Sequence, residues 1–143
     1  MAPRAPLARV RAICLALPDG VEKEAWGSPT FRVGGGKMFA MFVDDHHGDG
    51  RVAIWCKAEP GVQEIVVGAA PQRFFVPPYV GHNGWIGLRL DQPSTDWDEV
   101  AEFLADAHRL CAPKRLLKAM EAGAAPARQP AAKPQKATRA SKR

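Results

Sequence analysis

The sequence lacks the features that mark several classes of protein. None of its apolar runs approaches the roughly 18 residues that a membrane-spanning helix requires. Arginines interrupt the apolar residues of the first 17 positions, so no secretory signal is predicted there. The three cysteines are too few and too widely spaced for a disulfide framework or a zinc site, and buried free thiols are the better prediction. We therefore expect a cytoplasmic protein with no membrane partner.

Acidic residues are absent from the C-terminal end. All 15 of them lie at or before Glu121, whereas six of the 20 lysines and arginines follow it. Residues 1–121 thus carry 14 cations against 15 acids, a net charge of −1, and the overall charge of +5 comes from the last segment. Residues 122–143 contain three prolines and no large apolar side chain, a composition typical of disordered chain. We predict a folded domain over residues 1–121 and a disordered basic tail over residues 122–143.

Hydrophobic periodicity predicts the elements of the folded domain. Apolar residues at helical spacing predict a first helix that stops at Pro18, and a short helix begins near Pro60. A long helix begins at Asp96, with Glu99 placed to complete a capping box, and Pro113 begins a final helical turn. Short turn-rich links between strands indicate an antiparallel sheet with helices on one side, an α+β two-layer sandwich. The predicted strands are residues 30–33, 37–43, 51–57, 73–76 and 85–90.

Three segments resemble the MmcQ/YjbR family. They read WGSPTFRVGGGKMFAMF at residues 26–42, FFVPPYVGHNGWIGLRLD at 74–91 and DWDEVAEFLADAHRLCAPKRL at 96–116. They follow the family's order and cover nearly all of the folded part. The resemblance implies the YjbR-like fold, with the order α-β(3)-α-β(2)-α, which is also similar to that of secretion chaperones. It implies DNA binding, the label that the family generally carries, but no catalytic signature and no defined site.

The alternation of side chains along the strands gives the candidate binding surface. It places Trp55 and Trp85 together on the sheet face opposite the aliphatic residues that meet the helices. Cations that neutralise phosphates, beside rings that stack on bases, suit the binding of single strands or unpaired bases. The glycine-rich turn before Lys37 lacks the spacing of a phosphate-binding loop and precedes a strand, so we predict a tight hairpin turn there. Lys37 at the tip of this hairpin is a candidate contact for a nucleic-acid phosphate. The candidate nucleic-acid-binding residues are Arg32, Lys37, Arg51, Trp55, Lys57, Trp85 and Arg89.

Other interpretations of this face stay open. The tryptophans can seal a homodimer or an interface with a protein partner, and long cationic side chains also shield tryptophans on a sheet face that is simply solvated. The net charge of residues 1–121 argues against DNA binding by the domain itself. The six cations of the tail predict weak nonspecific contacts with DNA phosphates.

The remaining polar motifs predict no catalytic residue and no metal. Residues 44–50 collect carboxylates and imidazoles but lack EF-hand order. Tyr79, His82 and Asn83 lie in a loop stiffened by two prolines, and no nucleophile has an evident partner. We therefore predict a non-enzymatic DNA-binding protein without a cofactor, which uses the sheet face, the hairpin tips and the tail. The alternative is a chaperone-like protein-interaction module in which Trp55 and Trp85 anchor a partner or a second copy.

Overall fold

The computed structural model describes residues 5–122, apart from the side chain of His47. The chain divides into two units, residues 1–112 and 113–143. The second unit contains α4 (Lys114–Glu121), and the predicted tail beyond residue 122 lies outside the described residues. The first unit contains α1 (Pro6–Ala16), β1 (Gly20–Ala25), β2 (Ser28–Val33), β3 (Met38–Asp44), η1 (His46–Gly48), β4 (Val52–Cys56), α2 (Val62–Ala69), β5 (Phe74–Phe75), η2 (Gly81–Asn83), β6 (Ile86–Arg89) and α3 (Trp97–Cys111).

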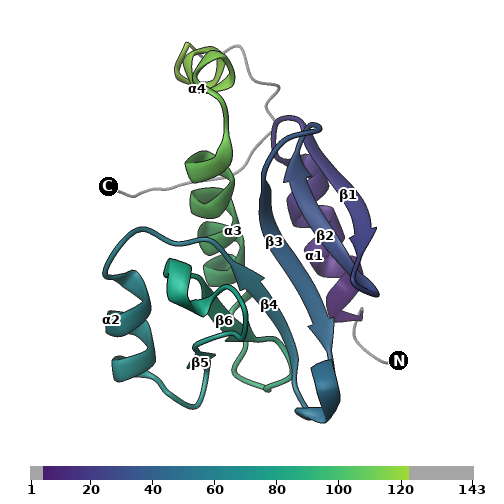
Figure 1. Ribbon diagram of the computed structural model, residues 1–143, viewed down its shortest axis with the longest axis vertical. Coiled ribbons are helices and arrows are strands. Elements are labelled where there is room, and N and C mark those ends of the chain that lie inside the picture. The colour runs from purple at the N-terminus through teal and green to yellow at the C-terminus, as the bar shows by residue number, and fades with distance from the viewer. Residues whose placement is uncertain (1–4, 123–143) are drawn as a thin grey trace. The chain divides into compact units, whose positions relative to one another are not determined.

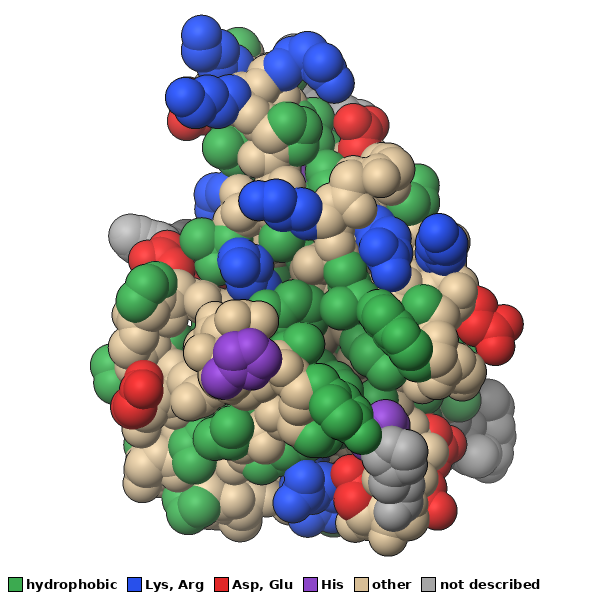
Figure 2. Space-filling view, in the orientation of Figure 1, with side chains coloured by type: hydrophobic (Ala, Val, Ile, Leu, Met, Phe, Trp, Pro, Cys, Tyr) green, Lys and Arg blue, Asp and Glu red, His purple; other side chains and the backbone are tan. Residues whose placement is uncertain are grey.

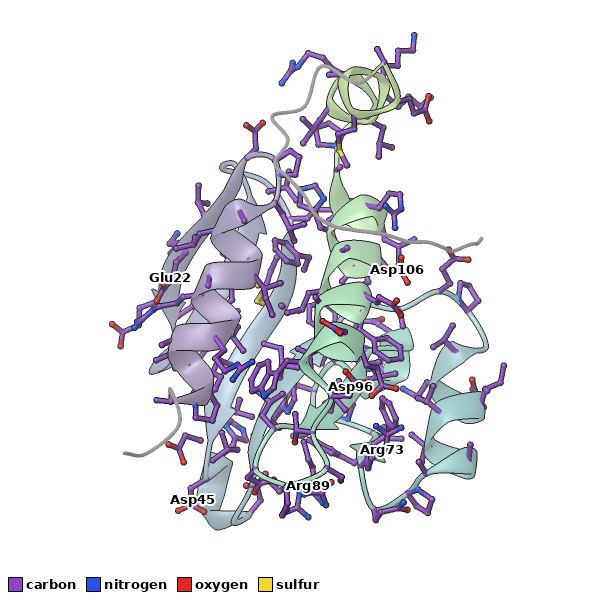
Figure 3. The ribbon with its side chains drawn as sticks, turned by 180° about the vertical axis from the view of Figure 1, so that it is seen from behind. Glu22, Asp45, Arg73, Arg89, Asp96 and Asp106 are labelled. Carbon is purple, nitrogen blue, oxygen red and sulfur yellow. The ribbon has the colours of Figure 1, made fainter. Side chains whose placement is uncertain are left out.

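A single antiparallel sheet of six strands forms the centre of the first unit, in the order β1-β2-β3-β4-β6-β5 (Figure 1). Both α1 and α3 cover one face of this sheet, which is the face seen from behind (Figure 3). The short helix α2 lies beside β5 (Figure 1). This arrangement confirms the predicted α+β class, the antiparallel sheet and the placement of two long helices on one side.

The edge strand β1 has no counterpart among the predicted strands. It reads GVEKEA, with charged side chains on both alternating sets, so it shows no apolar face in the sequence. It forms a strand because it pairs with β2 from Gly20↔Val33 to Ala25↔Ser28, and because α1 packs on it. The guanidinium of Arg11 on α1 also donates two hydrogen bonds to the Glu22 carboxylate, at 2.8 and 2.9 Å. Charges on an edge strand protect it from pairing with other chains.

The main core lies between the sheet and α3. The register aligns Phe31, Ala40, Cys56 and Ile86 across four strands, and all four are buried. The carboxylate of Asp96 accepts hydrogen bonds from the backbone amides of Asp98 and Glu99, so Asp96 caps α3 as predicted. The buried residues of α3 are Val100, Leu104, Ala107, His108 and Cys111.

All three cysteines are buried and free, which confirms that prediction. Burial raises the pKa of the Cys56 thiol to about 12, and it also raises the pKa values of Cys14 and Cys111. Desolvation disfavours the thiolate, so these cysteines act as small apolar side chains.

His108 is a polar residue that is buried in this core. Its Nε2 lies 2.6 Å from the backbone oxygen of Pro18, and its ring packs edge-on against Phe39. Because a carbonyl oxygen only accepts, Nε2 carries a proton and donates it to Pro18. Burial lowers the pKa of His108, although the contact with Pro18 opposes that shift.

This burial predicts a loss of stability in mild acid. The unfolded chain binds the proton of His108 at a higher pH than the folded chain, so stability falls as the pH drops below the ordinary value of 6.5 and on through the folded pKa. We expect urea midpoints to decrease between about pH 7.5 and 5.5, and His108→Gln to flatten that decrease because it does not titrate. The exposed His82 supplies the control substitution His82→Gln, which should keep the wild-type slope. Equal slopes in the wild type and His108→Gln would contradict this account.

Candidate functional site

A second apolar cluster lies on the sheet face that α1 and α3 leave uncovered. Its buried members come from β3, β4 and the residue before β6, and the register places Met41 opposite Trp55 and Val43 opposite Ala53. Trp55 and Trp85 are 2% and 6% exposed. The cluster consists of Met41, Val43, Ala53, Trp55 and Trp85, with Met38, Phe75 and Val80 packed against it.

The burial of both tryptophans corrects the expectation that their rings stand open for stacking. The alternation of residues along the strands placed them on the correct face. However, Met38, Phe75 and Val80 pack over the two tryptophans, so the indole rings lie beneath the surface and form the floor of this face. Phe75 lies directly over Gly87, where an added Cβ would come within 2.4 Å of its ring. The rings on which a base could stack must therefore come from other residues.

An apolar hollow of about 540 Å³ opens above this floor. In the space-filling view, apolar side chains gather across the middle of this face (Figure 2). We call this site the aromatic hollow. Its lining includes two buried side chains, Met41 and Trp55, and two exposed aromatic side chains, Trp26 and Tyr79. The remaining lining side chains are of intermediate burial: Met38, His46 and Val80.

Trp26 forms one side of the hollow from the turn between β1 and β2. It is 75% exposed. Only Trp26 and Gly27 connect the paired residues Ala25 and Ser28, and their φ values are +54° and +77°. Two positive φ angles in a two-residue hairpin are those of a type I′ turn, in which asparagine or aspartate is the favoured first residue. A bulky aromatic residue is unfavourable there.

Tyr79 is the second exposed aromatic residue of the hollow, and its backbone is also strained. Its φ is +68°, and the Val80 amide donates to the Pro78 oxygen at 2.7 Å. A hydrogen bond between residues two apart around a positive φ is the rare, strained form of the γ-turn. The side-chain amide of Gln63 on α2 holds the loop in place, because it donates to the oxygens of Gly81 and Trp85 at 2.8 and 2.7 Å. Backbone strain of this kind concentrates at functional sites.

His46 connects the floor of the hollow with Tyr79. Its ring meets Trp55 edge-on with centroids 4.9 Å apart, and it meets Tyr79 edge-on at 5.9 Å. The residue before it, Asp45, has a φ of +56°, and its carboxylate accepts a hydrogen bond from the Gly50 amide at 2.7 Å. The β3–β4 hairpin therefore fixes the imidazole against both rings.

Three cations lie at the end of the sheet where β2 turns into β3. Arg32 pairs with Met38, Lys37 belongs to the turn, and the Lys57 amide donates to the Phe39 oxygen at 3.1 Å. In the described part of the chain, none of the three takes part in a salt bridge. None of the three lines the hollow itself, but Arg32 pairs with Met38, which does.

The YjbR family model matches residues 15–110, which is more than half of the chain. The chain belongs to the YjbR family. A solved structure with the same kind of fold is Deinococcus radiodurans protein DR2400, whose family-model domain is DUF419. It is 21% identical, with a TM-score of 0.65 over 82% of this chain and 87% of that chain, and likeness at this identity shows the fold alone. Comparison with curated proteins gives no match.

In this YjbR-family protein, two of the predicted site residues are already engaged. The Arg51 guanidinium lies 4.0 Å from the centre of the Phe75 ring. Arg89 donates to both oxygens of Asp91 at 3.1 Å. Burial acts to raise the pKa of Asp91, but the hydrogen bonds from Arg89 and the Val52 amide outweigh it and lower that pKa. Arg32 has a longer contact, a hydrogen bond of 3.3 Å from its Nε to the Thr30 hydroxyl, so Lys37 and Lys57 are the predicted cations with the most freedom to meet a ligand.

The lining of the YjbR-family hollow is mainly apolar and aromatic. Its lining contains aromatic rings, thioethers and one imidazole, with no serine or cysteine nucleophile. Among residues 5–122, side chains of the metal-ligating types form no group of three or more that could hold an ion. No helix in that range is long and apolar enough to cross a membrane.

Proposed function

We propose that this YjbR-family protein is a non-enzymatic binding protein for single-stranded or unpaired DNA, and that the aromatic hollow is its site. The observation that carries the proposal is the pair of exposed rings, Trp26 and Tyr79, each held in a strained backbone beside one apolar hollow. Exposed aromatic rings stack on unpaired bases without reading sequence. In duplex DNA the bases are paired and stacked, so their faces are closed to these rings.

The charge distribution supports different contributions of the two units to DNA binding. Residues 1–112 carry 11 lysines and arginines against 14 acidic residues, a net charge of −3. Residues 113–143 carry nine against one, a net charge of +8. Long-range attraction to phosphates therefore comes from the second unit, with little dependence on strand form. The first unit adds stacking, together with phosphate contacts at Arg32, Lys37 and Lys57.

Fluorescence anisotropy of the full chain tests this proposal. The probes are a labelled single strand of about twelve nucleotides and its duplex, because one stacking site is a few nucleotides wide. We expect Tyr79→Ser to weaken single-strand binding about fivefold or more and to leave duplex binding unchanged. Ile65→Ser is the matched control, since Ile65 on α2 is 69% exposed and does not line the hollow. Equal losses in both variants, or no loss in either, would refute the site.

Salt dependence separates the cations of the sheet end from those of the second unit. Replacing Lys37 and Lys57 by glutamine should reduce the steepness of the log–log salt plot by about 0.7 for each phosphate of a single strand that the variant no longer neutralises. The wild-type affinity should remain higher for single strands than for duplex at high salt, where the contribution of the second unit is weakest. An unchanged slope would remove these two lysines from the interface.

A protein partner or a second copy is the alternative occupant of the same hollow. The observation that favours it is the apolar lining, because a buried pocket with aromatic edges also suits an anchoring side chain of another protein. The net negative charge of residues 1–112 points the same way. Light scattering distinguishes a second copy from DNA as the occupant of the hollow. A dimer that Tyr79→Ser converts to a monomer would support the second copy.

A further inference from the structure

The floor of the aromatic hollow contains a hydrogen-bond donor without an acceptor. Trp55 is 2% exposed, and within the described part of the chain its indole Nε1 has no hydrogen-bond partner. Buried tryptophan N–H groups usually find a partner, and an unpaired one calls for an explanation. Trp55 is also part of the lining of the hollow. A ligand in the hollow is one source of the acceptor.

The position of this donor is fixed by the sheet. Trp55 lies in the middle of β4, where it is paired with Met41 of β3 on one side and Gly87 of β6 on the other. Its ring is held by the edge-on contact with His46. Its neighbours in the hollow include Met38 and Met41, whose unbranched side chains adapt readily to an inserted group. The site therefore combines a rigid donor with a floor that can yield.

Three features define the chemistry of the ligand. The exposed rings of Trp26 and Tyr79 suit one planar ring, and the donor in the floor calls for an acceptor on that ring. The cations Arg32, Lys37 and Lys57 at the end of the sheet suit a phosphate attached to it. An unpaired nucleotide, whose base carries acceptor atoms on its edge, has all three.

We infer that the aromatic hollow takes a single extruded nucleobase, and that the Trp55 Nε1 proton is donated to an acceptor atom on the edge of that base. The inference rests on the proposed function and adds to it the donor that holds the base. Every base presents such an acceptor, a carbonyl oxygen in thymine, cytosine and guanine and a ring nitrogen in adenine. A ring with the shape of a base but without its acceptors should therefore bind more weakly than the base.

The test measures binding of the full chain to DNA strands in which every position is abasic except one, which carries a single base. The bases are thymine, adenine and difluorotoluene, which has the shape of thymine without its carbonyl acceptors, and an entirely abasic strand measures binding to the backbone. We expect thymine to bind about five- to tenfold more tightly than difluorotoluene, the range of a single hydrogen bond. Adenine, whose ring nitrogens also accept hydrogen bonds, should bind more tightly than the abasic strand. Difluorotoluene should still bind more tightly than the abasic strand, because it stacks.

The variant Trp55→Phe keeps an aromatic ring in the floor and removes the N–H group. It should bind thymine and difluorotoluene equally. Met41→Leu, a neighbour in the same floor, is the matched control and should keep the preference for thymine. Thermal melting checks that both variants fold. If Trp55→Phe does not fold, the comparison of thymine with difluorotoluene on the wild type decides the question alone.

The outcomes separate this inference from the function on which it rests. Equal binding of thymine and difluorotoluene by the wild type, with both weakened by Tyr79→Ser, overturns the hydrogen bond from Trp55 and leaves single-strand binding in place. No difference between any base and the abasic strand overturns both, and points to a protein in the hollow. A thymine preference that survives Trp55→Phe assigns the acceptor to another donor and also overturns the inference.

Discussion

Trp26→Asn should weaken single-strand binding about tenfold to a hundredfold while the fold becomes as stable or more stable. The loss follows from the stacking energy of one base on an aromatic ring, about 1–3 kcal/mol. The gain follows from the turn, since asparagine is favoured at the first position of a type I′ hairpin and tryptophan is not. Relief of about 1 kcal/mol of backbone strain corresponds to a few degrees in melting temperature. Opposite effects on binding and on stability are typical of a residue that is retained for function.

The measurement pairs anisotropy with thermal melting for the wild type, Trp26→Asn and Ile65→Asn. The control replaces an exposed apolar residue outside the hollow, so it accounts for any general effect of reduced surface hydrophobicity. A fall in melting temperature for Trp26→Asn would mean that the indole covers the floor and serves the fold. Unchanged affinity with a raised melting temperature would remove Trp26 from the binding surface.

The parts of the fold that the sequence predicts are those set by local periodicity. Val100, Leu104, Ala107 and Cys111 follow helical spacing, and all four are buried on α3. The cap at Asp96 also depends only on residues within one turn. The edge strand β1 is different, because its stability comes from β2 and α1, and its own residues carry charges on both sides.

The missed strand also hid the most exposed residue of the candidate site. Without β1, the dipeptide Trp26-Gly27 does not read as a two-residue hairpin turn, although glycine at the second position is a signal for one. Trp26 consequently appeared only within a segment that resembles the family. A strand prediction that admitted charged edge strands would have found both the hairpin and its unusual aromatic residue.

The alternation of residues along the strands assigned Trp55 and Trp85 to the correct face but could not show what covers that face. The cover comes from Met38, Phe75 and Val80, which are distant in sequence from Trp55, and from a loop that Gln63 holds in place. Such contacts depend on tertiary structure and leave no periodic signal. The same holds for Arg89, whose pairing with Asp91 becomes visible only once the side chains are placed.

Gly20→Ala should destabilise the protein by about 2–4 kcal/mol, the largest effect we expect from the addition of one methyl group. A Cβ at Gly20 would lie 2.1 Å from the backbone oxygen of Cys14 and 3.1 Å from that of Leu17. Both oxygens belong to the end of α1, and the Gly20 amide donates to the Leu17 oxygen at 2.9 Å. Backbone groups in a helix end cannot turn aside as a flexible side chain can. The methyl group must therefore push α1 away from β1.

Gly35→Ala is the matched control for this substitution. Gly35 lies in the β2–β3 turn, no atom lies within 4 Å of its added Cβ, and its φ is not in the left-handed region. Its replacement should change stability by less than about 0.5 kcal/mol, whereas Gly20→Ala should lower the melting temperature by roughly 10 °C or more. Because β1 ends in the turn that carries Trp26, displacement of β1 should also weaken single-strand binding at temperatures where the protein is still folded. A loss of stability without a loss of binding would show that the hairpin tip keeps its position when the start of β1 moves.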